Sequence, residues 1–276
     1  MFRPARRAAA VVAAAALALG LTACDTGGSG STGDYVTEGK LTIATGEPAY
    51  PPYVLDDDPS SGAGFESAVA YAVAAELGFS ADDVVWVRAT WDETIAPGPK
   101  GYDINLQQVT ISDDRAEDID FTSAYYTAPQ AIITVAGSAA EGIISISGLA
   151  ALQIGAATGS TSLTTIEEVI QPTQSPSVFN SNDDAVLALQ NNQVDAIVVD
   201  LPTALYMTAA VLESGVVLGQ FPADGIGDQW GIVLEKDSPL TSAVSSAVDA
   251  ITASGELESI TAEWMNDWAG APILAP

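Results

Sequence analysis

Arg115 is the residue of this 276-residue sequence whose chemistry and position best suit the capture of a small carboxylate. It follows the expected strand 102–106 by a few residues, and ligands of open α/β sheets bind beyond such strand ends. A planar guanidinium can hold a carboxylate through two parallel hydrogen bonds. The sequence leaves a second interpretation open, in which Arg115 forms a surface ion pair with Asp113, Asp114 or Asp118.

A second candidate for anion binding is the run Thr158-Gly159-Ser160-Thr161, which directly precedes an expected helix. The first backbone N–H groups of a helix have no partner within it, so Ser160 and Thr161 could bind an anion through their backbone. Asp200 directly follows the expected strand 194–199 and comes two residues before Pro202. From the residues alone, it could serve as the N-cap of the helix that follows.

The composition excludes several classes of function. The chain has 8 Lys and Arg against 36 Asp and Glu, and its formal charge of −28 repels a nucleic-acid backbone. Without histidine, the sequence has no imidazole for a Ser/His/Asp or Cys/His nucleophile or for most zinc sites. The single cysteine allows no internal disulfide. We therefore expect no nucleic-acid partner, no metal and no cofactor.

The N-terminal residues resemble the signal of an exported lipoprotein. Arg3, Arg6 and Arg7 precede an apolar run over residues 8–21, which is typical of a secretory signal peptide. This run of about 14 residues is shorter than the roughly 20 that a membrane-spanning helix needs. The triplet Leu-Thr-Ala then precedes Cys24 and resembles the lipobox of bacterial lipoproteins, in which the cysteine carries a diacylglyceryl group. We expect a signal peptide over residues 1–23 and a lipid on Cys24; an ordinary signal peptide followed by a free cysteine is the alternative.

The rest of the sequence predicts a tether and two α/β lobes. Residues 24–39 are rich in Gly and Ser without an apolar period, as in a flexible tether. Beyond them, short β-rich runs alternate with helical patterns, which indicates βαβ units and a mostly parallel sheet. In one helix, Phe65, Val69 and Val73 recur every four residues. The expected strands are 41–44, 84–87, 102–106, 152–155, 177–179 and 194–199, and the expected helices are 65–77, 163–169, 182–191, 240–251 and 257–268.

A longer pattern around Arg115 resembles the family 3 extracellular solute-binding proteins of bacteria. In that family a strand ends in a polar loop, a Thr-x-x-x-x-Arg step follows, and Asp-Phe-Ser/Thr-x-x-Tyr comes next. Here the step is Thr110 to Arg115, and the last motif is Asp120 to Tyr125. Five other segments resemble the family in the same order, so that the resemblance extends from Lys40 to Trp268: residues 47–53, 64–66, 155–161, 193–200 and 231–240.

The resemblance implies a type II periplasmic-binding-protein-like fold, in which two α/β lobes are joined by two crossover strands and close on an amino acid. The chain would leave the first lobe near Pro129 and return to it near Gly227. We therefore expect lobe I over residues 40–128 plus 228–276 and lobe II over residues 129–227.

The resemblance also implies which residues hold the charged groups of the ligand. Arg115 would bind the α-carboxylate, with help from backbone N–H groups at Thr110, Ser160 and Thr161. Asp200 would pair with the α-ammonium group.

A second group of residues would meet the ligand side chain. Glu47 matches an acid that pairs with the side-chain cation in lysine-, arginine- and histidine-binding relatives. Tyr50 matches a ring that stacks on the ligand, and Trp86 matches the opposite wall, with Trp91 as its competitor. Together these residues would set which amino acid fits.

The charges of this site favour a basic amino acid. Glu47, Asp200 and Arg115 sum to −1, which an amino acid with a cationic side chain would neutralise, whereas a neutral ligand would leave an acid uncompensated. Polar neutral amino acids such as glutamine come next. Gln107 and Gln108 stand where small serines are common in the basic amino-acid binders, and they leave less room for the ligand.

These inferences predict a monomeric, extracytoplasmic receptor, held at the membrane by the lipid on Cys24, that passes an amino acid to the transmembrane subunits of an ABC permease. No catalytic residue is assigned. The alternative is a related dehydratase-type enzyme that acts on a small carboxylic acid or amino acid, with Glu47 or Asp200 as general acid or base. The sensor domain of a signalling receptor is a third interpretation.

Overall fold

The computed structural model describes residues 35–222, 228–268 and 270–276. The expected signal peptide, Cys24 and the first part of the expected tether lie outside these ranges. The described residues belong to one compact unit. Within them, we find no helix that is both long and apolar enough to cross a membrane.

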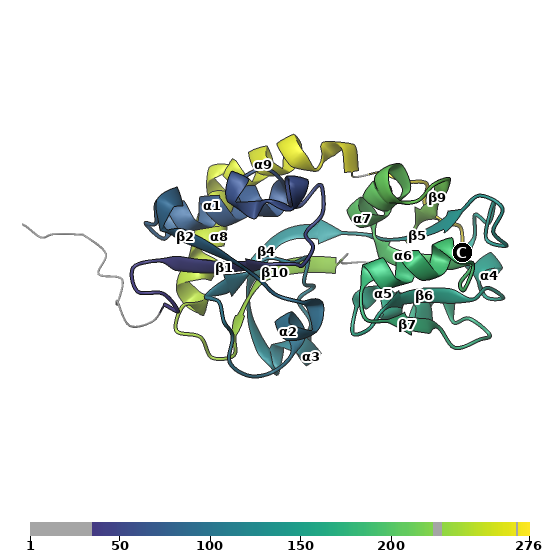
Figure 1. The fold of residues 1–276 in the computed structure, drawn as a ribbon, viewed down its shortest axis with the longest axis horizontal. Coiled ribbons are helices and arrows are strands. Elements are labelled where there is room, and N and C mark those ends of the chain that lie inside the picture. Colours follow the sequence, from purple (N-terminus) through teal and green to yellow (C-terminus); the bar gives the residue numbers. More distant parts are fainter. Residues whose placement is uncertain (1–34, 223–227, 269) are drawn as a thin grey trace, which may run out of the picture. The chain divides into compact units, whose positions relative to one another are not determined.

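The first of two five-stranded sheets in the described chain has the strand order β2-β1-β3-β10-β4 (Figure 1). β1 pairs in parallel with β2 and β3, whereas β10 runs antiparallel to β3 and β4. The bounds are β1 Leu41–Thr45, β2 Val84–Arg88, β3 Ile104–Asn105, β4 Ile119–Ala128 and β10 Asp228–Glu235. β1 is buried along its whole length and lies between β2 and β3.

Three helices pack together over the core of the first sheet: α1 (Phe65–Glu76), α8 (Thr241–Ser254) and α9 (Glu256–Trp264) (Figure 1). The four-residue recurrence predicted for α1 is observed, since Phe65 and Val69 are fully buried in that core. The two other helices of this lobe are short: α2 (Trp91–Ile95) and α3 (Asp113–Ala116).

Gly64 allows α1 to begin directly against the preceding loop. Its φ of 109° lies in a region that side chains rarely adopt, and an added Cβ would lie 2.5 Å from the carbonyl oxygen of Tyr53. The glycine therefore sets how closely the helix start approaches the loop that carries Glu47 and Tyr50.

The second sheet has the strand order β7-β6-β8-β5-β9. β6 pairs in parallel with β7 and β8, and β5 is antiparallel to β8 and β9. The strands are β5 Gln130–Val135, β6 Ile154–Ala157, β7 Ser177–Phe179, β8 Ala196–Asp200 and β9 Gly215–Gln220. The helices are α4 Ile146–Leu149, α5 Thr161–Thr165, α6 Asn182–Gln190 and α7 Leu201–Tyr206.

The chain passes from one sheet to the other after β4 and again after β9, and the C-terminal residues add a further link. β4 leads through Pro129 into β5, and residues 221–227 lie between β9 and β10. Residues 270–276, which we expected in lobe I, pack against the second sheet. Ile273 bridges to Gln220, and Leu274, only 2% exposed, joins the apolar core of that sheet.

Candidate ligand-binding site

A cavity of about 170 Å³ is lined by residues of both sheets. Its walls come from segments at or after the carboxyl ends of β1, β2, β3, β6, β7 and β8, where parallel α/β sheets commonly bind ligands. The lining residues are Thr45, Gly46, Glu47, Pro48, Ala49, Tyr50, Trp91, Gln107, Gln108, Thr110, Ala157, Ser160, Thr161, Ser162, Ser181, Asn182, Asp183, Asp200 and Thr203. Eight of the ten predicted binding residues are therefore brought together, and Arg115 and Trp86 are not among the lining residues.

Arg115 is not among the lining residues and joins loops of the two lobes. Its Nη1 donates to the carbonyl oxygen of Thr110 at 2.7 Å and its Nη2 to that of Gly159 at 2.8 Å. The guanidinium lies 5.3 Å from the centre of the Trp91 ring, a distance typical of a cation–π contact. Burial lowers the pKa of Arg115, opposed by the charges of Asp228 and Asp200.

The predicted anion site at Ser160 and Thr161 opens α5. Ser160 is its N-cap, and the Ser160 hydroxyl accepts a hydrogen bond from the backbone N–H of Leu163. The Thr161 hydroxyl lies 3.5 Å from that of Thr110, on the other lobe. The residues that were predicted to assist Arg115 therefore meet on one side of the cavity.

Asp200 lies at the end of β8, and its side chain does not cap the following helix α7. Its Oδ1 instead accepts a hydrogen bond from Gln130 Nε2 at 2.6 Å. Burial, followed by the neighbouring Asp228, raises the pKa of Asp200 to about 8, although Gln130 and Arg115 act in the opposite direction. An ammonium group of a ligand would satisfy this carboxylate.

Glu47 and Tyr50 reach the cavity from the loop between β1 and α1. The Glu47 side chain is exposed, whereas Tyr50 is half-buried. Burial and a hydrogen bond with Asp183 raise the pKa of Tyr50 well above its usual value. Asp183 belongs to α6, so the hydroxyl of Tyr50 links the two lobes beside the cavity.

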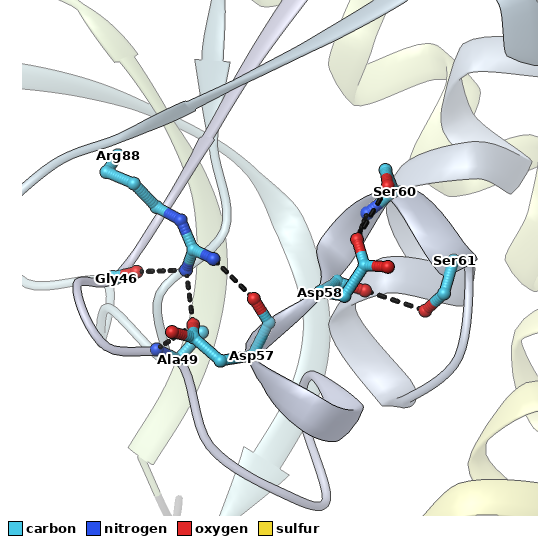
Figure 2. Close-up of polar contacts among 7 residues, drawn as sticks. All are labelled: Gly46, Ala49, Asp57, Asp58, Ser60, Ser61 and Arg88. Atoms are coloured by element: carbon cyan, nitrogen blue, oxygen red, sulfur yellow. Dashed lines mark hydrogen bonds and ion pairs between the residues drawn. The ribbon is translucent and has the colours of Figure 1, made fainter.

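Arg88 braces this loop from the end of β2, as Figure 2 shows. Its Nη1 donates to the carbonyl oxygen of Gly46 and lies 2.7 Å from Asp57 Oδ1, while its Nη2 donates to the backbone carbonyl oxygen of Asp57. Asp57 Oδ1 also accepts from the backbone N–H of Ala49. Arg88 therefore holds this loop at Gly46 and at Asp57 with contacts that do not involve a ligand.

Gln107 and Gln108 lie on the lobe I side of the cavity, and each is held by a neighbour. Gln107 Oε1 accepts a hydrogen bond from the Thr94 hydroxyl at 2.8 Å. Gln108 has a positive φ of 54°, and both its backbone N–H and its side-chain amide donate to the carboxylate of Glu66. Tyr125 donates to the same carboxylate. Burial raises the pKa of Glu66 to about 7, opposed by these hydrogen bonds.

The structure places Trp91, rather than Trp86, beside the cavity. Trp86 stands opposite Ile43 in the strand register, packs against the lobe I core and donates from Nε1 to the hydroxyl of Tyr71. Trp91 opens α2 after the N-cap Thr90, lines the cavity and donates to the carbonyl oxygen of Thr158. The tryptophan that lines the cavity is therefore Trp91, five residues after Trp86 in the chain.

Several polar residues at the site carried no sequence signal that singled them out. Asp183 and Thr203 line the cavity, and Gln130 and Asp228 lie next to Asp200. Asp183 follows Ser181 at the start of the expected helix 182–191, which was the available hint. In the described part of the chain, no group of acidic residues is arranged to hold a metal ion.

Comparisons with known proteins agree with this architecture. The model of the bacterial extracellular solute-binding proteins, family 3, matches residues 41–267. The L-arginine-binding protein of Pseudomonas aeruginosa is 28% identical over 221 residues, covering 78% of this chain and 83% of that protein. The L-cystine-binding protein TcyJ of Escherichia coli is 28% identical over 266 residues, covering 94% and 95% of the two chains.

Solved structures show the same fold. An ancestral amino acid-binding protein, described as a precursor of cyclohexadienyl dehydratase, is 27% identical with a TM-score of 0.66, covering 82% of this chain and 95% of that one. This likeness confirms the type II periplasmic-binding-protein fold that the resemblance implied. Because the family model matches almost the whole described chain, this protein belongs to the bacterial extracellular solute-binding proteins, family 3.

Proposed function

We propose that this protein binds an amino acid in the cavity between its lobes and delivers it to an ABC permease. The observation that carries the proposal is a guanidinium and a buried carboxyl group that lie near each other at the site. Arg115 and Asp200 lie close enough for each to shift the pKa of the other. One cation and one buried acid are the complement of an α-carboxylate and an α-ammonium group.

Arg115 has the donors that an α-carboxylate needs. A guanidinium carries five N–H groups, and the described bonds to Thr110 and Gly159 use one on each of two nitrogens. Thr110, Ser160 and Thr161 line the cavity nearby. A ligand carboxylate would therefore bind between Arg115 and the start of α5, with the α-ammonium directed to Asp200.

The side-chain end of the site favours a cationic ligand. Glu47 and Asp183 contribute carboxylates, and Tyr50 and Trp91 contribute aromatic rings that attract a cation. Because Glu47 is exposed, water solvates its carboxylate. A neutral ligand that does not pair with Glu47 therefore costs little free energy, and neutral ligands stay compatible with the site. We therefore propose a basic amino acid first and a polar neutral one such as glutamine second. The names of the relatives, an L-arginine-binding and an L-cystine-binding protein, support an amino acid without selecting one.

The remaining features complete the proposal. A signal peptide over residues 1–23 and a lipid on Cys24 would hold the protein on the extracytoplasmic side of the membrane, where a permease receives the ligand. We propose that it works as a monomer.

Isothermal titration calorimetry of the exported protein against the twenty amino acids tests the proposal. We expect L-arginine or L-lysine to bind, Arg115→Ala to abolish all binding and Glu47→Gln to weaken only the cationic ligands. Asp249→Asn, an exposed acid on α8, is the control and should bind as the unmodified protein does. Tighter binding of L-glutamate than of L-arginine would refute the assignment of a basic ligand.

A dehydratase-type activity is the second candidate. Asp200 lines the cavity and has a pKa of about 8, and a carboxyl group that keeps its proton near neutral pH suits a general acid. One of the similar solved structures, the ancestral amino acid-binding protein, is described as a precursor of a dehydratase. Mass spectrometry of the ligand after incubation separates the two. Unchanged ligand supports the receptor, whereas a dehydrated product supports the enzyme.

A further inference from the structure

A glutamine amide joins two carboxylates where the chain crosses between the lobes. Gln130 is the first residue of β5, and Asp228 is the first residue of β10. Gln130 Nε2 lies 2.6 Å from Asp200 Oδ1 and 2.5 Å from Asp228 Oδ2. The Gln130 amide on the first crossover therefore links Asp228, on the second crossover, to Asp200 at the ligand site.

The chemistry of the amide fixes its orientation. An amide nitrogen has two N–H groups, and each has a carboxylate acceptor here. The amide oxygen accepts from the Ser162 hydroxyl at 2.7 Å. A flipped amide would place its oxygen against two carboxylates. Because Gln130 is only 7% exposed, water offers little compensation for losing these bonds.

Asp228 also holds the start of α5. Its Oδ2 accepts a hydrogen bond from the Thr161 hydroxyl at 2.8 Å. Thr161 is the first residue of α5 and lines the cavity. One carboxylate thus reaches both ends of the site: the ammonium end through Gln130 and Asp200, and the carboxylate end through Thr161.

We propose that Asp228 is a positioning residue of the ligand site, which acts through Gln130 and Thr161 to hold Asp200 and the start of α5 in the geometry that binds an amino acid. The inference rests on the proposed function for its ligand, and on the four hydrogen bonds described above for its geometry. It differs from the family's ligand contacts because Asp228 does not line the cavity.

The charge of Asp228 acts on Asp200 separately from these hydrogen bonds. Burial raises the pKa of Asp200 most, Asp228 and Glu66 raise it further, and the Gln130 amide and Arg115 lower it. Burial, and after it the charge of Asp200, raises the pKa of Tyr53 and of Tyr126. Ligand ammonium binding needs an ionised Asp200, so Asp228 should shift binding to higher pH.

The matched variants Asp228→Asn and Asp228→Ala separate geometry from charge. An asparagine oxygen can still accept from Gln130 and Thr161, whereas alanine cannot. In calorimetric titrations of the full exported protein with L-arginine from pH 5.5 to 9, we expect Asp228→Ala to bind about tenfold more weakly. Asp228→Asn should keep most of the affinity, and its affinity should reach the plateau at a lower pH. Asp249→Asn should change neither.

A ligand-free measurement keeps this inference separate from the proposed function. Carbon-13 NMR of the aspartate carboxyls follows the titration of Asp200, assigned with Asp200→Asn. The midpoint should fall in Asp228→Asn and stay unchanged in Asp249→Asn. An unchanged midpoint, or an Asp228→Ala protein that binds L-arginine as tightly as the original, would overturn the role of Asp228. If the unmodified protein binds no amino acid, the proposed function fails, and the NMR midpoint still decides the role of Asp228.

Discussion

At the scale of single residues, Trp86 and Trp91 lie five positions apart but in different environments. Trp86 is within β2, on the face that packs into the core beside Ile43. Trp91 comes after the strand end, where the chain turns into α2, and its ring lies by the cavity and under the Arg115 guanidinium. The same residue type therefore stabilises the lobe in one place and is available to a ligand in the other.

Trp91→Leu and Trp86→Leu form a matched test of this difference. Trp91→Leu should weaken L-arginine binding by about tenfold, because it removes an aromatic face worth roughly 1–2 kcal/mol to a cation. Trp86→Leu should lower the melting temperature and leave the affinity within about twofold, since its ring is a core contact. Calorimetry measures the affinities, and thermal unfolding measures the melting temperatures. Weaker binding in Trp86→Leu than in Trp91→Leu would show that Trp86, and not Trp91, contacts the ligand.

At the scale of elements, the loop between β1 and α1 is held from a neighbouring strand. Arg88 bonds the carbonyl oxygens of Gly46 and Asp57, and Asp57 bonds the backbone of Ala49 (Figure 2). Glu47 and Tyr50 sit between these anchors. The strand β2 therefore positions two proposed binding residues that it does not carry.

Arg88→Ala should loosen this loop more than it destabilises the fold. The ion pair with Asp57 is partly exposed, so its loss should cost no more than about 1 kcal/mol. Hydrogen exchange of residues 46–57 should accelerate, and L-arginine should bind severalfold more weakly. Lys236→Ala, which removes an ion pair with Asp120 elsewhere in lobe I, is the control and should change neither measurement. Unchanged exchange in Arg88→Ala would show that the loop is held by other contacts.

At the scale of the whole molecule, two buried acids link stability and binding to pH. Glu66 is 1% exposed and supports Gln108, while Asp200 lines the cavity. Burial raises the pKa of Glu66 from 4.5 to about 7 and that of Asp200 from 3.8 to about 8. In each case the folded state holds a proton over a pH range in which the unfolded chain has released it.

The sign of this linkage makes the protein less stable as the pH rises. Between about pH 4.5 and 7 the folded state keeps the proton on Glu66, so the free energy of unfolding should fall by on the order of 3 kcal/mol over that range. Glu66→Gln should remove this part of the slope in urea unfolding measured from pH 4.5 to 8, while Glu76→Gln, an exposed acid at the end of α1, should keep it. An identical slope in Glu66→Gln and the original protein would contradict the role given to Glu66.

Part of this architecture was predictable because local patterns specify it. The spacing of Phe65, Val69 and Val73 predicted α1, and the runs 41–44 and 194–199 predicted β1 and β8 closely. The strand 102–106 was too long, since β3 contains only Ile104–Asn105. Local sequence reports which face is apolar, but it does not report how many residues find a pairing partner.

The sequence by itself determined the family resemblance, the place of Arg115 beyond an expected strand end, and eight of the residues that line the cavity. The tertiary structure alone decided that Trp91 meets the cavity, that the C-terminal residues return to the second sheet, and that Gln130 joins Asp200 to Asp228. The physical reason is range: Gln130 and Asp228 are separated by 98 positions, and a single sequence carries no periodicity over such a distance. Only folding brings the two crossovers together, and only then does one amide have two carboxylates to bind.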